Sequence, residues 1–376
     1  SSCLARTGTP LIRWPLPTRA PPMMLCHHPR FLTNRTSIIL STCIGVAICV
    51  SRASQSMRGP ASLSIAQSSR ERPRRVLSIG DLHGDARHAA ELLRALGVMD
   101  KQGDWSGGEA VLVQTGDIVD RGDHSKQIYE MLFRLQDQAP MQGGEVVMLL
   151  GNHELMHMQG DTRYMTGEDA AEFGGAASCE AAFGPDGWLG HRLRERGRVA
   201  ALLGAAYGLA QPVVYVHAGI LSSVAGAYAR QALSLAEGGG GSEAGLRTVH
   251  ALNEAARALL LGRGEAELGA DHSALFGDGG PLWTRRLALG EHPCEDLRQT
   301  LRLLNASRMV VGHTAQSDGR IHHRCEGRLV LADTLISEAY SGTSHPSAVE
   351  VTPNGCAHAL YPVRGSRQEL PCLGGA

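Results

Sequence analysis

Six side chains that can bind metal ions follow short apolar runs of this sequence. They are Asp81, His83, Asp117, Asn152, His217 and His313. Together these carboxylate, imidazole and amide donors suit Mn²⁺, Fe or Zn²⁺. Six ligands are too many for one tetrahedral zinc ion, so they favour two divalent metal ions bridged by a carboxylate. Two ions about 3.5–4 Å apart hold a phosphoryl group and lower the pKa of a bridging water, which attacks as hydroxide near neutral pH.

Alternating strands and helices are expected to position these residues. Apolar runs predict strands at 76–80, 110–116, 145–151, 213–219 and 308–314, and two more at 328–334 and 347–352 close a sheet. Apolar residues at helical spacing predict helices at 85–96 and 124–135. Such alternation indicates parallel βαβ units, whose polar turns meet beyond the carboxyl ends of the strands. The sequence therefore predicts an α/β protein with one polar crevice.

Five short motifs stand at these strand ends: GDLHGD at 80–85, GDIVDRGD at 116–123, GNHE at 151–154, HAG at 217–219 and GHT at 312–314. A single DxH pair or strand-end histidine is more often structural than a ligand. The five in this order resemble the phosphoprotein phosphatases of the calcineurin-like metallophosphoesterase superfamily, over about residues 74–352. The stretches LLGNHELMHMQGDTRYM and PLWTR resemble one subgroup, the Shewanella-like protein phosphatases. The Ser-Ala-Pro-Asn-Tyr motif of eukaryotic family members is absent, which fits this subgroup.

The resemblance implies an architecture and its domain limits. The fold would be a central mixed β-sandwich flanked by helices, within a phosphatase domain at 73–365. A helical cap would be inserted at about 155–210 and a further helical insertion at about 221–300. Residues 366–376 would form a tail.

The resemblance also assigns the metal ligands. Asp81, His83 and Asp117 would bind the first ion, and Asp117 would bridge to the second. The second ion would be completed by Asn152, His217 and His313.

Further roles in catalysis and phosphate binding follow from the same resemblance. His153 would be the general acid that protonates the leaving alkoxide or phenoxide, and Asp120 would hold its imidazole. Arg121 and Arg285 would clamp phosphate oxygens, because the planar guanidinium makes bidentate contacts to phosphate. Asn152 would add a phosphate contact.

Other polar residues receive lesser roles. Arg163 is a candidate either for a third phosphate contact or for a surface position. His157 is expected to lie behind the ligands or in solvent rather than to bind metal, and Asp333 is expected to make structural hydrogen bonds. Exposed positions are predicted for His88, His191, His322 and His323.

Residues 1–72 are expected to form a targeting leader, mostly disordered. Residues 1–75 hold 11 arginines and one acid, whereas the whole chain has a net charge of −1. An apolar segment at 38–50 is as long as the core of a signal peptide and too short to span a bilayer, and a Ser- and Arg-rich stretch follows it. This predicts entry into the secretory pathway or an organelle (plastid or endoplasmic reticulum), with membrane or translocon contact through the leader.

The remaining composition limits partners and covalent links. Net charge near zero argues against nucleic acid as a partner. Five cysteines follow the leader, an odd number without a CxxC pair, so neither a disulfide framework nor a zinc ribbon is predicted. The oligomeric state stays open.

Several functions share this metal chemistry. The first is hydrolysis of phosphoprotein esters, at serine and threonine or at tyrosine. The alternatives are a broad small-molecule phosphatase and a symmetrical dinucleoside tetraphosphatase, a class that typically reads GDLVARG and GNHD. Asp120 before Arg121, and Glu154 at the end of GNHE, favour the protein phosphatases. A pseudophosphatase scaffold would have lost ligands, and all six ligand positions are present.

Overall fold

The computed structural model describes residues 74–234, 243–263 and 271–373, except the side chain of His272. The predicted leader and its apolar segment lie outside these residues. No helix in the described ranges is long and apolar enough to cross a membrane.

Two mixed β-sheets form the centre of the fold. The first has six strands in the order β11-β10-β9-β1-β2-β3, and the second has five in the order β4-β5-β6-β8-β7. The first comprises β1 Val76–Ile79, β2 Val111–Gln114, β3 Glu145–Met148, β9 Ala348–Val351, β10 Ala357–Tyr361 and β11 Ser366–Leu370. The second comprises β4 Ala200–Leu203, β5 Val213–Val216, β6 Arg308–Val311, β7 His322–Arg324 and β8 Leu329–Leu331.

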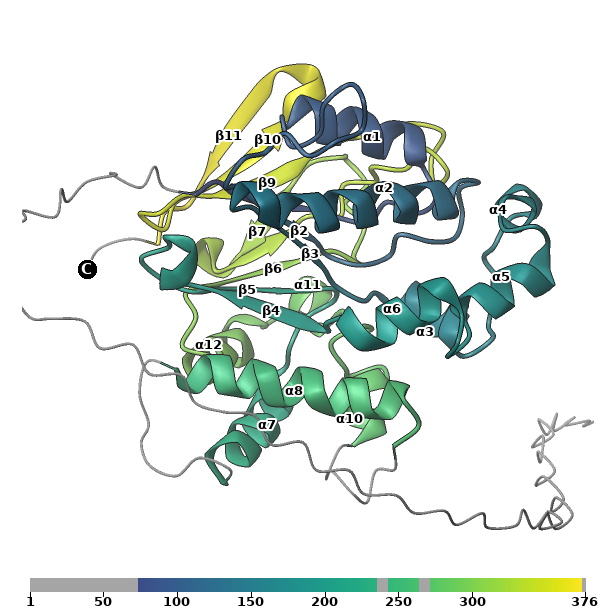
Figure 1. Cartoon of the computed structure of the whole chain (residues 1–376). Coiled ribbons are helices and arrows are strands. Elements are labelled where there is room, and N and C mark those ends of the chain that lie inside the picture. The colour runs from purple at the N-terminus through teal and green to yellow at the C-terminus, as the bar shows by residue number, and fades with distance from the viewer. Residues whose placement is uncertain (1–73, 235–242, 264–270, 374–376) are drawn as a thin grey trace, which may run out of the picture. The chain divides into compact units, whose positions relative to one another are not determined.

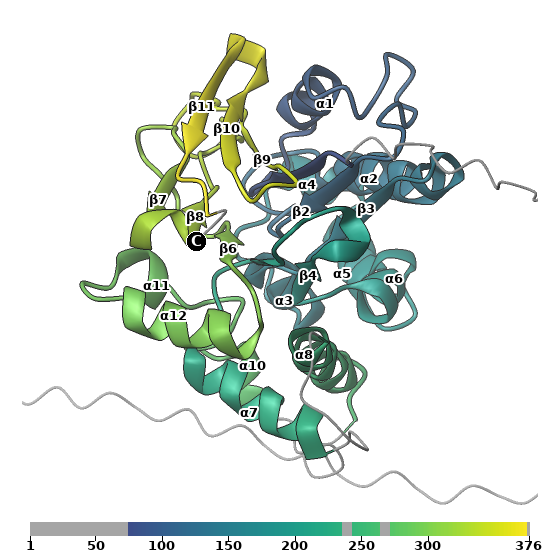
Figure 2. The same ribbon diagram turned by 90° about the vertical axis from the view of Figure 1, so that its left-hand side faces the viewer.

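Helices cover the outer faces of both sheets (Figures 1 and 2). Helices α1 Ala86–Ala95 and α2 Ser125–Gln138 lie beside the first sheet, and α7 Ser222–Ser234, α8 Ala244–Leu260 and α12 Cys294–Leu303 lie beside the second. Between β3 and β4 come α3 Asn152–Met158, α4 Gly167–Glu172, α5 Ala176–Phe183 and α6 Trp188–Arg196. Two short helices, α10 His272–Phe276 and α11 Arg286–Leu289, precede α12.

Alternate residues of the central strands face two different cores. Val111 and Val113 of β2 join Tyr215 of β5 in a buried cluster that contains residues of both sheets. Leu112 of β2 and Val214 of β5 belong to the cluster formed with the helices. These strands are continuously apolar because one face packs against the other sheet and the other face against helices. The predicted α/β class and the mixed sandwich flanked by helices are confirmed.

Parallel pairing directs the polar motifs to one edge. Strands β1, β2 and β3 are parallel neighbours, and β5 is parallel to β6, which is parallel to β8. The loops that follow β1, β2, β3, β5 and β6 carry the five motifs.

Some local expectations were wrong. The sequence at 200–203 has the composition of a helix, yet it forms β4, because β5 supplies an antiparallel partner. Strand β11, in the segment expected to be a tail, pairs with β10. No disulfide framework was predicted, yet four cysteines form two disulfides, Cys294–Cys325 and Cys356–Cys372, and Cys179 is free and buried.

Candidate active site

Left-handed turns after the parallel strands carry much of the site. His83, Asp117 and His313 have φ angles of 39°, 56° and 62°. Such angles cost about 1–2 kcal/mol in residues other than glycine and persist where the surrounding structure holds them. Gly116 shows how closely the loops pack, since a Cβ there would lie 2.5 Å from the backbone nitrogen of Gly151. The loops after β2 and β3 therefore touch.

Glu154, to which the sequence assigned no role at the site, anchors the loop of Asp117. Its fully buried carboxylate accepts the backbone N–H groups of Asp117 at 2.9 Å, Ile118 at 2.8 Å and Gly151 at 2.7 Å. The hydroxyl of Tyr129 donates to it at 3.1 Å. The signal in the sequence was its place in GNHE, but only the folded chain shows which N–H groups it receives.

Asp81, His83 and Asp117 come together as predicted. The Nε2 atom of His83 lies 3.7 Å from Oδ2 of Asp117 and 4.0 Å from Oδ2 of Asp81. Its Nδ1 is 2.9 Å from the carbonyl oxygen of Val119 and can only donate to it. The hydrogen therefore sits on Nδ1, and the lone pair of Nε2 faces the two carboxylates.

Asp117, Asn152, His217 and His313 form a second group, here called the acceptor cluster. Nε2 of His217 lies 3.0 Å from Oδ1 of Asn152, 3.1 Å from Nδ1 of His313 and 3.3 Å from Oδ2 of Asp117. Nδ1 of His217 faces the carbonyl of Thr115 at 2.9 Å. On His313, Nε2 faces the carbonyl of Trp283 at 3.0 Å. Both imidazoles donate outward, so four acceptor atoms converge with no hydrogen between them.

This donor set fits divalent cations. Burial lowers the pKa of His83 to about 4 and that of His313 to about 3, so both present neutral ligand nitrogens. Burial, and next the charge of Asp333, raises the pKa of Asp81. Burial would raise the pKa of Asp117 as well, but the charge of neighbouring imidazoles such as His153 holds it well below its usual range. A cation between these groups would offset the repulsion between the facing acceptor atoms. It would also offset the free-energy cost of burying the carboxylates.

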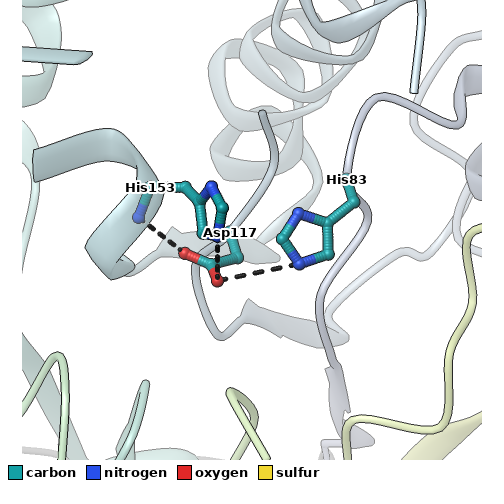
Figure 3. Close-up of side chains that lie close together, drawn as sticks. All are labelled: His83, Asp117 and His153. Atoms are coloured by element: carbon teal, nitrogen blue, oxygen red, sulfur yellow. Dashed lines mark hydrogen bonds and ion pairs between the residues drawn. The ribbon is translucent and has the colours of Figure 1, made fainter. Parts of the chain in front are cut away.

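His153 and Asp120 lie beside these ligands. Nδ1 of His153 is 2.5 Å from Oδ2 of Asp120, and its Nε2 is 3.9 Å from Oδ2 of Asp117. Figure 3 shows the imidazoles of His83 and His153 approaching the same oxygen of the Asp117 carboxylate. Burial opposes the charged imidazolium, but the carboxylates of Asp117 and Asp120 raise the pKa of His153 above its ordinary value. A protonated His153 beside the metal ligands can serve as an acid.

Arg121 is held between two tyrosine rings that the sequence did not single out. Its guanidinium carbon lies 4.6 Å from the ring centre of Tyr164 and 4.4 Å from that of Tyr340. Its backbone N–H donates to the carbonyl of Tyr164 at 2.9 Å. The hydroxyl of Tyr340 is 3.0 Å from Nε2 of His83. No sequence signal links Tyr340 to this site, because it arrives on a loop after β8.

Arg285 and Arg163 differ in their relation to the site. Arg285 precedes α11 and donates from Nη2 to the carbonyl of His313 at 3.4 Å, which places it at the acceptor cluster. Arg163 is exposed and paired with Asp161 at 2.6 Å. The surface position anticipated for Arg163 is therefore the one observed.

The remaining polar predictions have mixed outcomes. Asp333 is buried and accepts the N–H of Leu335 at 3.2 Å, the structural role expected of it. His157 lies behind the site on Asp120. His88 is not on the surface as predicted: it is 8% exposed and bonds Asp85 at 2.6 Å, the carboxylate that also caps α1. Exposed positions are confirmed for His191, His322 and His323.

Comparisons with known proteins agree with this geometry. A family model described as calcineurin-like phosphoesterase matches residues 74–226. An uncharacterized protein of Schizosaccharomyces pombe is 34% identical over 280 residues, which cover 72% of this chain and 75% of that protein. Shewanella-like protein phosphatase 2 of Arabidopsis thaliana is 39% identical over 109 residues, 29% of this chain and 28% of that protein.

A solved structure shows the same overall arrangement. The cold-active protein-tyrosine phosphatase of a psychrophilic Shewanella species is 26% identical, with a TM-score of 0.61. The match covers 79% of this chain and 80% of that chain.

Proposed function

Because the chain belongs to the Shewanella-like protein phosphatases of the calcineurin-like metallophosphoesterase superfamily, we propose that it hydrolyses phosphomonoesters on proteins with two divalent metal ions. The family makes it a metal-dependent phosphatase. The observation that carries the finer proposal is the buried acceptor cluster beside the paired His153 and Asp120. Manganese, iron and zinc all suit these donors.

Each residue would have a defined task. The ions would be held by Asp81 and His83 on one side, by the acceptor cluster on the other, and by Asp117 between them. When bound, they would polarise the phosphoryl group and activate water. Arg121 and Arg285 would bind the remaining phosphate oxygens.

His153 would handle the proton of the leaving group. As water oxygen bonds to phosphorus and the ester P–O bond breaks, the electron pair goes to the leaving oxygen. Nε2 of His153 would give that oxygen a proton, and Asp120 would hold the imidazole through Nδ1. A positioned acid of this kind contributes about 10²–10⁴-fold on a poor leaving group.

A protein substrate is favoured over a dinucleotide by the partner of His153. The residue before Arg121 is Asp120, and its carboxylate makes the 2.5 Å contact to that imidazole. The dinucleotide class typically lacks an acid there. The similar Arabidopsis protein is named as a protein phosphatase, and the Shewanella protein as a protein-tyrosine phosphatase. Both serine/threonine and tyrosine esters are therefore candidate substrates.

The test is phosphate release by the manganese-loaded protein from phosphoserine, phosphothreonine and phosphotyrosine peptides and from diadenosine tetraphosphate. We expect turnover of at least one peptide class and none of the dinucleotide. Preference for the dinucleotide would contradict the substrate assignment but leave the metal site standing. Metal binding without release from any ester would contradict the enzymatic role.

A further inference from the structure

Asp120 touches two imidazoles, although the proposed chemistry uses only one. Its Oδ2 lies 2.5 Å from Nδ1 of His153, and its Oδ1 lies 2.7 Å from Nε2 of His157. The side chains of Asp120 and His157 are 0% and 1% exposed. These three residues, here called the His–Asp–His chain, are closed to solvent at the end remote from the metal ligands.

The spacing of the two histidines explains this contact. His153 and His157 are four residues apart on α3, so their side chains lie on the same helix face. The turn at Asp120 enters between them. A carboxylate can only accept, so the hydrogen of His157 sits on Nε2 and that nitrogen donates.

The other nitrogen of His157 has no such task. Its Nδ1 is buried and has no hydrogen-bond partner among the described residues. The ring packs 4.5 Å from the ring of Phe183. Among the described residues, the contact to Asp120 is therefore the one hydrogen bond that this imidazole makes.

The Asp120 turn is one that needs support. Asp120 and Arg121 have consecutive φ angles of 71° and 70°, both in the left-handed region. Without the N–H of His157, one oxygen of Asp120 would lose its hydrogen-bond donor in a place that solvent does not reach. A buried carboxylate oxygen without a donor is unfavourable, and rotation of the carboxylate would be the simplest way to relieve it.

We propose that His157 is a positioning residue for the reaction: it fixes the carboxylate plane of Asp120, and so keeps the imidazole of His153 aimed at the leaving oxygen. The proposal rests on the proposed function, because it takes His153 as the acid. It predicts that losing His157 weakens protonation of the leaving group and spares steps that need no proton.

Two esters of similar shape separate these effects. Phenyl phosphate releases a basic phenoxide that benefits from an acid, whereas 4-nitrophenyl phosphate releases a stable anion that needs little help. The reference is His153→Asn, whose amide can keep the contact to Asp120 but cannot deliver the proton. It should lose far more turnover of phenyl phosphate than of the nitrophenyl ester. Equal losses there would contradict the acid role in the proposed function, independently of His157.

The variants of His157 then test the inference itself. His157→Phe keeps the contact with Phe183 and removes the donor. We expect its kcat to fall roughly 10–100-fold on phenyl phosphate and less than about threefold on the nitrophenyl ester, in line with the usual effect of removing a partner behind a functional imidazole. His157→Gln places an N–H near the position of Nε2 and should recover most of the loss. The neighbouring buried Met156→Leu should change neither rate.

The opposite results are equally definite. Equal losses on both esters in His157→Phe, with no recovery in His157→Gln, would mean that His157 supports the fold alone, and the inference would be wrong. If His157→Phe does not fold, His157→Asn replaces it, because its shorter amide does not reach Asp120. The same ester ratio in His157→Asn and His157→Gln would then overturn the inference, and a selective loss in His157→Asn would support it.

Discussion

The acceptor cluster and the His–Asp–His chain lie side by side and are built in opposite ways. In the chain, two imidazole N–H groups meet the two oxygens of one carboxylate. In the cluster, Nε2 of His217 faces three other acceptors within 3.3 Å. Hydrogen-bond donors and acceptors are therefore matched in the His–Asp–His chain and unmatched in the acceptor cluster. If the proposed function is right, the fold alone arranges the proton-transfer groups, whereas activation of the phosphate would depend on bound cations.

Replacing Asp117, the carboxylate predicted to bridge the two metal ions, should have the largest effect on the acceptor cluster. Asp117→Asn removes the charge shared by both metal positions but leaves the bonds within the His–Asp–His chain. We expect both metal ions to be lost and turnover of 4-nitrophenyl phosphate to fall by at least roughly 10³-fold, because the nucleophile is no longer activated. The measurement is metal content per chain by mass spectrometry, together with the rate.

The outcome that would contradict the bridge is equally measurable. A purified Asp117→Asn protein that still held two metal ions per chain would show that Asp117 is not shared between them. As a folding control, the metal-free variant should unfold in one cooperative thermal transition, so that lost metal binding is not confused with lost structure.

The pH dependence of stability in the metal-free protein should distinguish the acceptor cluster from the His–Asp–His chain. Burial lowers the pKa of His313 to about 3, below the 6.5 of an ordinary histidine. Below pH 6.5 the unfolded chain therefore takes up a proton that the folded protein does not. The free energy of unfolding should fall as the pH drops, with a slope of up to about 1.4 kcal/mol per pH unit from His313. His153 has a raised pKa, so its contribution is present below pH 6.5 and is lost as the pH rises through the folded value.

Urea unfolding of the chelated protein between pH 7.5 and 4.5 measures this. His313→Gln should flatten the loss of stability on the acid side. His153→Gln should leave that loss in place and instead remove stability near and below neutral pH. An identical pH dependence of stability in both variants would contradict the prediction that the folded protein lowers the pKa of His313 and raises that of His153.

Much of this site was readable from the sequence, for a local reason. Each of the six predicted ligands belongs to a short motif after an apolar strand, and parallel pairing then brings the strand ends together. The apolar runs at 110–116 and 213–219 predicted the strands β2 and β5. These features depend on near neighbours in the chain, so a single sequence carries them.

What the sequence did not reveal depends on distant partners. Tyr340 meets Arg121 only because the loop after β8 returns to the first sheet. Cys294 and Cys325 are 31 residues apart, and nothing in their spacing specifies the pairing. His157 is the intermediate case: the four-residue spacing from His153 was visible, but the carboxylate between them comes from another loop.

The smallest predicted effect concerns the phosphate-binding arm that adjoins the chain. Arg121 follows Asp120 directly, and Tyr164 covers one face of its guanidinium at 4.6 Å. A cation–π contact at a partly exposed site is worth about 0.5–1 kcal/mol, so Tyr164→Leu should raise the inhibition constant for inorganic phosphate roughly two- to fivefold. Tyr164→Phe keeps the ring and should bind phosphate as the wild type does.

Tyr164 is a cleaner probe than Tyr340 because of what each hydroxyl touches. The Tyr340 hydroxyl lies 3.0 Å from Nε2 of His83, so its replacement would disturb a predicted metal ligand together with Arg121. The backbone bond from Arg121 to Tyr164 survives any side-chain change. Unchanged phosphate inhibition in Tyr164→Leu would mean that the turn at Asp120 positions Arg121 without help from this ring. Weaker phosphate inhibition in the leucine variant alone would instead make the ring part of the phosphate site. The fold would then position the phosphate-binding arginine, as it positions the acid, without help from the metal ions.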